Sequence, residues 1–253
     1  MLLITHQSLA QKESESLGTV KFDAKSTKTA SIFKHKTTGL VYFKADFDLD
    51  MDGSPRAYNA SNTGIEDNGN AMNSKGEFLP NVILLDGLKK PILQNQTDPF
   101  PGFFISLTTL NLQNSLITSP KHYVNSDEIP YFVLPIEKVN KSVRIGDIGL
   151  IFNTLTKQSA FAIFADTNPN VIGEGSIALA KKLGINAKLN SKGKFIGGNE
   201  NGDILYIVFP KSGKGASGYQ DLTLEDVETL GNKAITKFGD KEKVIKMILD
   251  LMK

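Results

Sequence analysis

Cysteine is absent from this sequence. Its absence excludes disulfide bonds, thiolate zinc sites and cysteine nucleophiles together. It does not exclude export, because proteins without cysteine also occur in cell envelopes. The sequence also lacks any apolar run near the roughly 18 residues that a membrane-spanning helix requires. We therefore expect no membrane segment.

A strong charge of one sign is missing as well. The 253 residues include 29 basic and 27 acidic side chains, which gives a formal net charge of +2. The lysines are scattered and do not alternate with aromatic residues along one strip, so the sequence does not predict a nucleic-acid partner. The three histidines, His6, His35 and His122, lack metal-ligand spacing, and we expect them at the surface.

Hydrophobic residues make up 40% of the chain, which is enough for a sizeable core. We expect a globular monomer whose length fits one large domain or two small ones. Residues 1–29 are interpreted as a flexible leader, because a polar stretch follows a short apolar start. The small residues Ser8 and Ala10 would also fit a remnant of a secretory signal, although a basic region is missing.

The remaining chain is predicted to be rich in strands, with helices gathered late. Residues 59–79 are rich in Asn, Gly, Asp and Ser, which predicts a long surface loop with one short helical turn. This order favours an α+β fold with a mixed or antiparallel, barrel-like core. We expect a catalytic β-rich domain at 30–220 and a helical extension at 221–253 packed on it. The predicted strands are 30–33, 40–49, 81–85, 103–110, 131–136, 147–153, 159–165 and 204–209. The predicted helices are 174–183, 224–238 and 240–251.

Two acids stand close together near the end of one predicted strand. Asp166 ends an apolar run, and Glu174 follows a turn that contains Pro169 and Gly173. Two carboxyl groups carried by rigid elements are what acid/base hydrolysis of a glycosidic bond requires. Structural roles are also open: Asp166 suits the start of a turn, and Glu174 suits a helix N-terminus. A helix dipole there would lower the pKa of Glu174 and oppose a role as general acid.

A second feature is a row of aspartates at every other position. On a strand, this spacing places the four side chains on one face, about 6.6–6.8 Å apart. Such a row requires water, cations or a cationic ligand to offset the repulsion. The row consists of Asp46, Asp48, Asp50 and Asp52.

Three interpretations of this row remain open. It is a solvated edge, a calcium loop or the acidic wall of a cleft. Asp48, Asp50, Asp52 and Gly53 match four positions of a helix–loop–helix calcium site, but Asn59 stands where that motif needs Glu.

Five blocks of the sequence stand out together: FKADFDLDMDGSPRAYN, IPYFVLPIE, VRIGDIGLIFN, SAFAIFADTNPNVIGEGSIALAKKLGI and LYIVFPKSG. In this order they resemble the chitosanases of glycoside hydrolase family 75. The resemblance runs from about residue 40 to 218, and the helical tail beyond Asp221 lies outside it. The chain departs from fungal members in having no cysteine and no clear signal peptide.

The resemblance implies a secreted or envelope enzyme that cleaves internal β-1,4 bonds of chitosan with inversion and without a cofactor or metal. It aligns Asp166 and Glu174 with the essential acids of the family, here with Glu174 as general acid and Asp166 as general base. The row of aspartates would bind the amines of this cationic polysaccharide. Arg56 and Tyr58 are candidates for orienting or stacking on the sugars. The alternative is a non-catalytic module that binds carbohydrate or calcium on the same fold.

Overall fold

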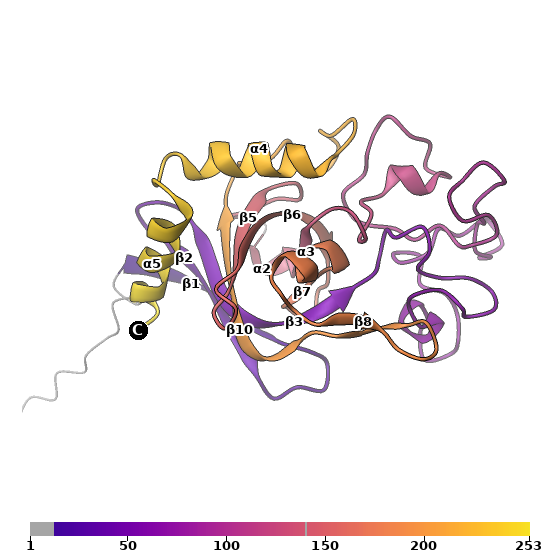
Figure 1. Ribbon diagram of the computed structural model, residues 1–253, viewed down its shortest axis with the longest axis horizontal. Coiled ribbons are helices and arrows are strands. Elements are labelled where there is room, and N and C mark those ends of the chain that lie inside the picture. The colour runs from indigo at the N-terminus through magenta and orange to yellow at the C-terminus, as the bar shows by residue number, and fades with distance from the viewer. Residues whose placement is uncertain (1–12, 140) are drawn as a thin grey trace, which may run out of the picture.

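The computed structural model describes residues 13–139 and 141–253 (Figure 1). The expectation of a signal remnant around Ser8 and Ala10 lies outside the described residues. The strands are β1 (Ser14–Lys21), β2 (Thr29–His35), β3 (Val41–Asp50), β4 (Tyr131–Leu134), β5 (Ile148–Asn153), β6 (Ser159–Thr167), β7 (Glu174–Ser176), β8 (Ala187–Leu189), β9 (Phe195–Gly197) and β10 (Asn199–Phe209). The helices are α2 (Ile136–Val139), α3 (Ile177–Lys182), α4 (Leu224–Ile235) and α5 (Lys241–Leu251), with 3₁₀ turns η1 (Asn68–Ala71) and η2 (Pro120–His122).

Six strands close into a mixed barrel in the order β3-β10-β5-β6-β4-β7, with β7 pairing back onto β3. The β3–β7 and β4–β6 pairs are parallel, and the remaining pairs are antiparallel. Closure leaves no open edge among these six strands. The fold is a β-rich α+β barrel, as the sequence predicted.

Aromatic rings fill the inside of the barrel. Tyr206 of β10 stacks on Phe43 of β3 at 4.7 Å and also meets Phe132 of β4 at 6.5 Å, across the barrel. Phe164 of β6 stacks on Phe132 at 5.7 Å. Each ring buries on the order of 150–250 Å². Gly175 faces inward and leaves room for a ring of β3, because a Cβ there would clash with Phe47.

The long connection between β3 and β4 forms a layer of loops on the outside of the barrel, at the right of Figure 1. This loop layer, residues 51–130, has an apolar cluster of its own that includes Met51, Tyr58, Ile83 and Phe104. The prediction of strands at 81–85 and 103–110 was wrong, since only isolated bridges form there. The short helical turn expected within residues 59–79 is η1.

Strand β1 corrects the expectation of a flexible leader through residue 29. Its residues pair antiparallel with β2, which extends the sheet from β3. The polar composition of this segment suits a hairpin at the exposed edge of a sheet. Because a flexible leader is polar as well, composition did not reveal the strand.

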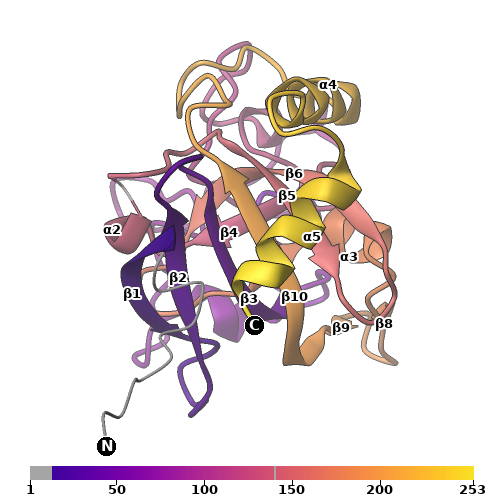
Figure 2. The same cartoon turned by 90° about the vertical axis from the view of Figure 1, so that its left-hand side faces the viewer.

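Helix α5 lies on the side of the barrel away from the loop layer, whereas α4 runs along the barrel against β5 and β6 (Figure 2). A capping box between Thr223 and Asp226 starts α4, and the Asp240 side chain caps α5. Val227 and Ile248 of these helices belong to the same apolar cluster as the barrel strands.

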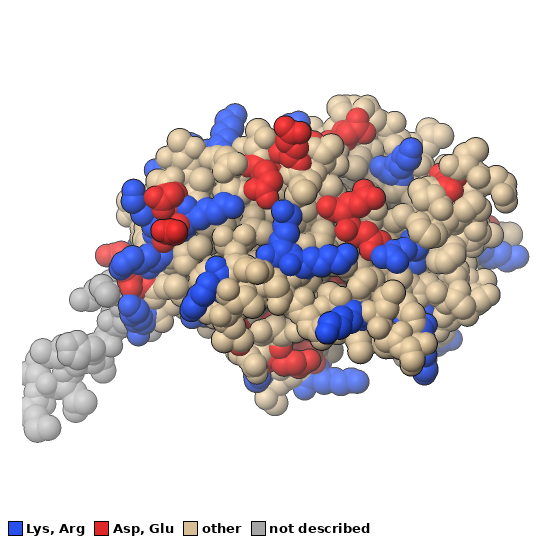
Figure 3. Space-filling model, viewed as in Figure 1, with Lys and Arg blue, Asp and Glu red and all other residues tan. Residues whose placement is uncertain are grey.

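Basic and acidic side chains are interspersed on the face shown in Figure 3. In the described part of the chain, no helix is long and apolar enough to cross a membrane.

Candidate active site

A cleft of about 760 Å³ lies between the outer face of the barrel and the loop layer. One wall comes from the ends of β3, β6 and β7, and the other from the loop layer and β9. Six carboxyl groups line the cleft, whereas no Lys, Arg or His of the described residues does. The acids are Asp48, Asp50, Asp52, Glu66, Asp166 and Glu174.

The two acids singled out in the sequence lie in one row across the barrel wall. Glu174 of β7 pairs with Asp48 of β3, and Asp166 of β6 pairs with Val133 of β4. Phe132 of β4 lies opposite Gly175, so Val133 falls between Asp166 and Glu174. Two strand spacings therefore separate the backbones of these acids, about 10 Å.

A β-bulge aims Asp166 into the cleft. Phe164 pairs with Phe132 and Asp166 with the next residue, Val133, so Ala165 is an extra residue in β6. Side chains two apart on a regular strand share a face. The extra residue breaks this rule, so that Phe164 points into the barrel while Asp166 lines the cleft.

The Asp166 carboxylate is held through one oxygen. Its Oδ1 accepts hydrogen bonds from the Thr109 hydroxyl at 2.6 Å, the Thr109 N–H at 3.1 Å and the Thr167 N–H at 2.8 Å. Burial and then the negative charge of Asp50 raise the pKa of Asp166 to about 7. The hydrogen bonds stabilise the ionised form and act against this rise.

Glu174 corrects an expectation about its surroundings. It belongs to β7, and the helix begins only at Ile177, with Ser176 as its N-cap. No helix dipole therefore lowers the pKa of Glu174. Burial, followed by the charges of Asp50 and Asp48, raises it to about 8. The Asn168 side chain donates a hydrogen bond to Glu174 Oε1 at 3.2 Å.

Three members of the aspartate row reach the cleft. Burial raises the pKa of Asp48 and that of Asp50 to about 6. Burial and then the Asp50 charge raise the pKa of Asp52 well above its usual value. Asp52 lies beyond β3 in a turn and accepts a hydrogen bond from the Tyr58 hydroxyl at 2.9 Å. Tyr58 lines the cleft but is only 3% exposed, so its ring presents no face to a sugar.

Two residues expected at the substrate lie elsewhere. Asp46 is 4% exposed and packs beneath Gly173, where a Cβ would clash with it. Burial and then the charge of Asp48 raise the pKa of Asp46 to about 8. Arg56 forms a bidentate pair with Asp127, at 2.6 and 3.0 Å, and lines a separate hollow. The structure therefore does not bring these two residues to the cleft.

The sequence interpretation missed several residues of the cleft. Glu66 and Asn70 belong to the loop layer, and Phe195 and Ile196 to β9. Their proximity depends on contacts between distant segments, such as the Phe195 N–H bond to the Ile65 carbonyl at 2.9 Å. The Asn- and Gly-rich composition of residues 59–79 was the only signal for Glu66.

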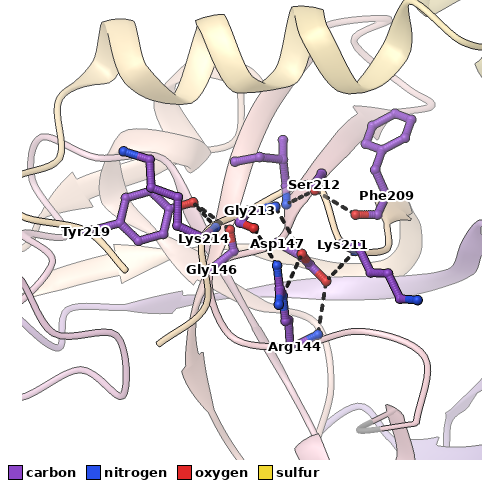
Figure 4. A network of polar contacts seen from close by, with 10 residues as sticks. Arg144, Gly146, Asp147, Phe209, Lys211, Ser212, Gly213, Lys214 and Tyr219 are labelled. Atoms are coloured by element: carbon purple, nitrogen blue, oxygen red, sulfur yellow. Dashed lines mark hydrogen bonds and ion pairs between the residues drawn. The ribbon is translucent and has the colours of Figure 1, made fainter. Parts of the chain in front are cut away.

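The fully buried carboxylate of Asp147 lies at the centre of a network of polar contacts (Figure 4). Asp147 accepts hydrogen bonds from the N–H groups of Arg144, Lys211 and Gly213 at 3.0–3.1 Å. These bonds hold the segment after β10. That segment in turn bonds to residues 111–114, close to Thr109.

The structure gives no support to the interpretation of the aspartate row as a calcium loop. Within residues 13–139 and 141–253, no three His, Cys, Asp or Glu side chains are arranged to hold a metal ion.

Residues 103–243 match the model of a family described as the fungal chitosanases of glycosyl hydrolase group 75. The chain belongs to this family. It is thus a glycoside hydrolase of the chitosanase type. No curated protein matches the chain. The matched region contains Thr109, Asp166 and Glu174, whereas the aspartate row precedes it. It also extends through α4, beyond the part in which the blocks of sequence suggested the resemblance.

Proposed function

We propose that this member of the family cleaves internal β-1,4 linkages of chitosan, with Asp166 and Glu174 as the acid/base pair. The observation that carries the proposal is the acidic lining of the cleft: six carboxyl groups and, among the described residues, no basic side chain. A ligand that carries regularly spaced ammonium groups would offset the charges of those that are ionised.

The surroundings of the two acids support distinct roles. A general acid must hold its proton, and the pKa of Glu174 is raised to about 8. A general base must be ionised, and three hydrogen bonds favour the ionised form of Asp166. Glu174 would protonate the leaving oxygen while Asp166 removes a proton from the attacking water.

The row across the barrel wall supports inversion. Inverting glycosidases place a water between the base and the sugar, so their carboxyl groups stand about 6.5–9.5 Å apart. Two strand spacings, about 10 Å, separate the backbones of Asp166 and Glu174. This separation leaves room for a water between the two acids, as inversion requires.

Other groups of the cleft would bind the polymer. Asp48, Asp50 and Asp52 would contact substrate amines from the barrel wall, and Glu66 from the loop layer. Ile196 is 52% exposed at the cleft and offers an apolar contact for a sugar face.

We propose that residues 30–220 form the catalytic domain together with β1, that helices 221–253 complete it, and that the enzyme acts as a secreted monomer. Apart from the polymer itself, the hydrolysis consumes only water and requires no cofactor.

Conversion of each acid to its amide tests the pair. Asp166→Asn and Glu174→Gln should each lower kcat on soluble chitosan by about 10²- to 10⁴-fold, the usual contribution of a general acid or base. Reducing-end release measures the loss, and NMR of the first product should show an α-anomer. The exposed Glu128→Gln is the matched control.

Near-normal rates in both amide variants would contradict the assignment. A wild-type protein that binds chitosan without releasing reducing ends would instead be a carbohydrate-binding module.

A further inference from the structure

We propose that Thr109 is a positioning residue that fixes one carboxylate oxygen of Asp166 and leaves the other to hold the attacking water. The inference rests on the proposed function. It concerns a residue that neither the sequence blocks nor the family match singles out.

The hydrogen bonds to Asp166 all fall on one side of its carboxylate. Both groups of Thr109 and the N–H of Thr167 donate to Oδ1. No described residue donates to Oδ2. Among the described residues, only Asp46 and Asn68 have a buried side-chain oxygen without a hydrogen-bond partner. Asp166 Oδ2 has no donor in this part of the chain and is not one of these buried atoms, so it is open to the cleft that Asp166 lines.

The hydroxyl of Thr109 has a defined direction. It donates its only proton to Asp166, and therefore accepts from the Thr167 hydroxyl, 3.1 Å away. A hydroxyl polarised in this way is a stronger donor to a carboxylate. The arrangement orders both threonine side chains around Oδ1.

The β-bulge that turns Asp166 outward also anchors Thr109. The carbonyl of the extra residue, Ala165, accepts a hydrogen bond from the Leu110 N–H at 2.8 Å. This bond holds the loop layer against β6, one residue away from Thr109. One irregularity of the strand thus places both the carboxylate and its donor.

Such a clamp serves a general base in two ways. It limits rotation of the carboxylate, so that the open oxygen keeps its aim at a water in the cleft. It also favours the ionised form, against the burial and the Asp50 charge that raise the pKa of Asp166. Loss of the hydroxyl should therefore weaken catalysis more than substrate binding.

Two variants of Thr109 test the inference. Thr109→Val removes the hydroxyl at nearly constant volume and keeps the backbone donor, whereas Thr109→Ser keeps both donors. On soluble chitosan oligomers, Thr109→Val should lower kcat by about 10- to 100-fold with KM nearly unchanged, the loss expected for one charge-assisted hydrogen bond. The acidic limb of its kcat/KM profile should move to higher pH. Thr109→Ser should restore both properties.

Wild-type kcat and an unmoved acidic limb in Thr109→Val would overturn the inference. So would an equal loss in Thr109→Ser, which would point to packing instead of the hydroxyl; the Tm of each variant checks folding. If Asp166→Asn is inactive while Thr109→Val behaves like the wild type, only this inference fails. If Asp166→Asn remains active, the proposed function fails and the inference with it.

Discussion

Among single residues, Asp50 has the widest electrostatic effect in the cleft. After burial, its charge is the largest influence that raises the pKa of Asp52, Asp166 and Glu174. No basic side chain of the described residues lines the cleft to offset it. The protonation of the proposed acid/base pair therefore depends on a residue that need not take part in proton transfer.

Asp50→Asn should shift the pH dependence of the enzyme downward. In the wild type, kcat/KM should fall below about pH 7 as Asp166 gains a proton, and above about pH 8 as Glu174 loses one. Removal of a neighbouring negative charge lowers both pKa values, so both limbs should move to lower pH. Profiles on chitosan oligomers measure the shift.

An exposed acid of α4, Glu225, supplies the control for this shift. Glu225→Gln makes the same change of charge and should leave both limbs in place. Limbs that stay fixed in Asp50→Asn, or that move to higher pH, would contradict the electrostatic account.

The candidate pair could be found from sequence, but its support could not. Asp166 and Glu174 stand at the end of an apolar run and after a turn, where local signals are strong. Thr109 lies 57 positions before Asp166, in a segment predicted to be a strand. Its role depends on a bulge at Ala165, which regular alternation does not reveal.

Among the elements, local patterns predicted the long strands of the barrel and the late helices but not β1, and long-range pairing decided the rest. β7 has only three residues and was predicted as the start of a helix. Its pairing with β3 and β4 competes with helix formation there and closes the barrel. Ser176 was a visible N-cap signal for the true start of α3.

Close packing of α4 on β6 gives a test of the interface between helix and barrel. A Cβ on Gly231 would overlap three ring carbons of Phe161, which is fully buried. Gly231→Ala should therefore destabilise the protein by about 1–3 kcal/mol, in spite of the better helix propensity of Ala. Chemical denaturation measures the free energy of unfolding.

Gly87→Ala is the matched control, because a Cβ there would meet open space. Its free energy of unfolding should stay within about 0.5 kcal/mol of the wild type. Equal stability of the two variants would show that α4 moves away from β6 at little cost.

For the whole molecule, the contrast between net charge and local charge is the main feature. The formal net charge is +2, yet the cleft carries six carboxyl groups. The order of the predicted elements gave the fold class, and composition gave only the small net charge. It could not predict the acidic cleft, because that concentration of charge arises when β3, β6, β7 and the loop layer come together.

Salt should weaken substrate binding more than catalysis. Between 0.1 and 1 M salt the screening length falls from about 10 to about 3 Å, so KM for chitosan oligomers should rise at least about threefold with kcat nearly constant. Steady-state kinetics across this range measures both constants.

Fully N-acetylated oligomers lack the ammonium groups and should be far poorer substrates at every salt concentration. A KM that does not change with salt, or equal turnover of chitosan oligomers and fully N-acetylated oligomers, would contradict binding of ammonium groups in the cleft.

The C-terminus lies at the end of the molecule away from the loop layer (Figure 1). The barrel lies between α5 and the loop layer, which forms one wall of the cleft. A bulky group joined to Lys253 would therefore be held clear of the groove. Immobilised on a solid support through this end, the enzyme would still present its groove to a long polysaccharide in solution.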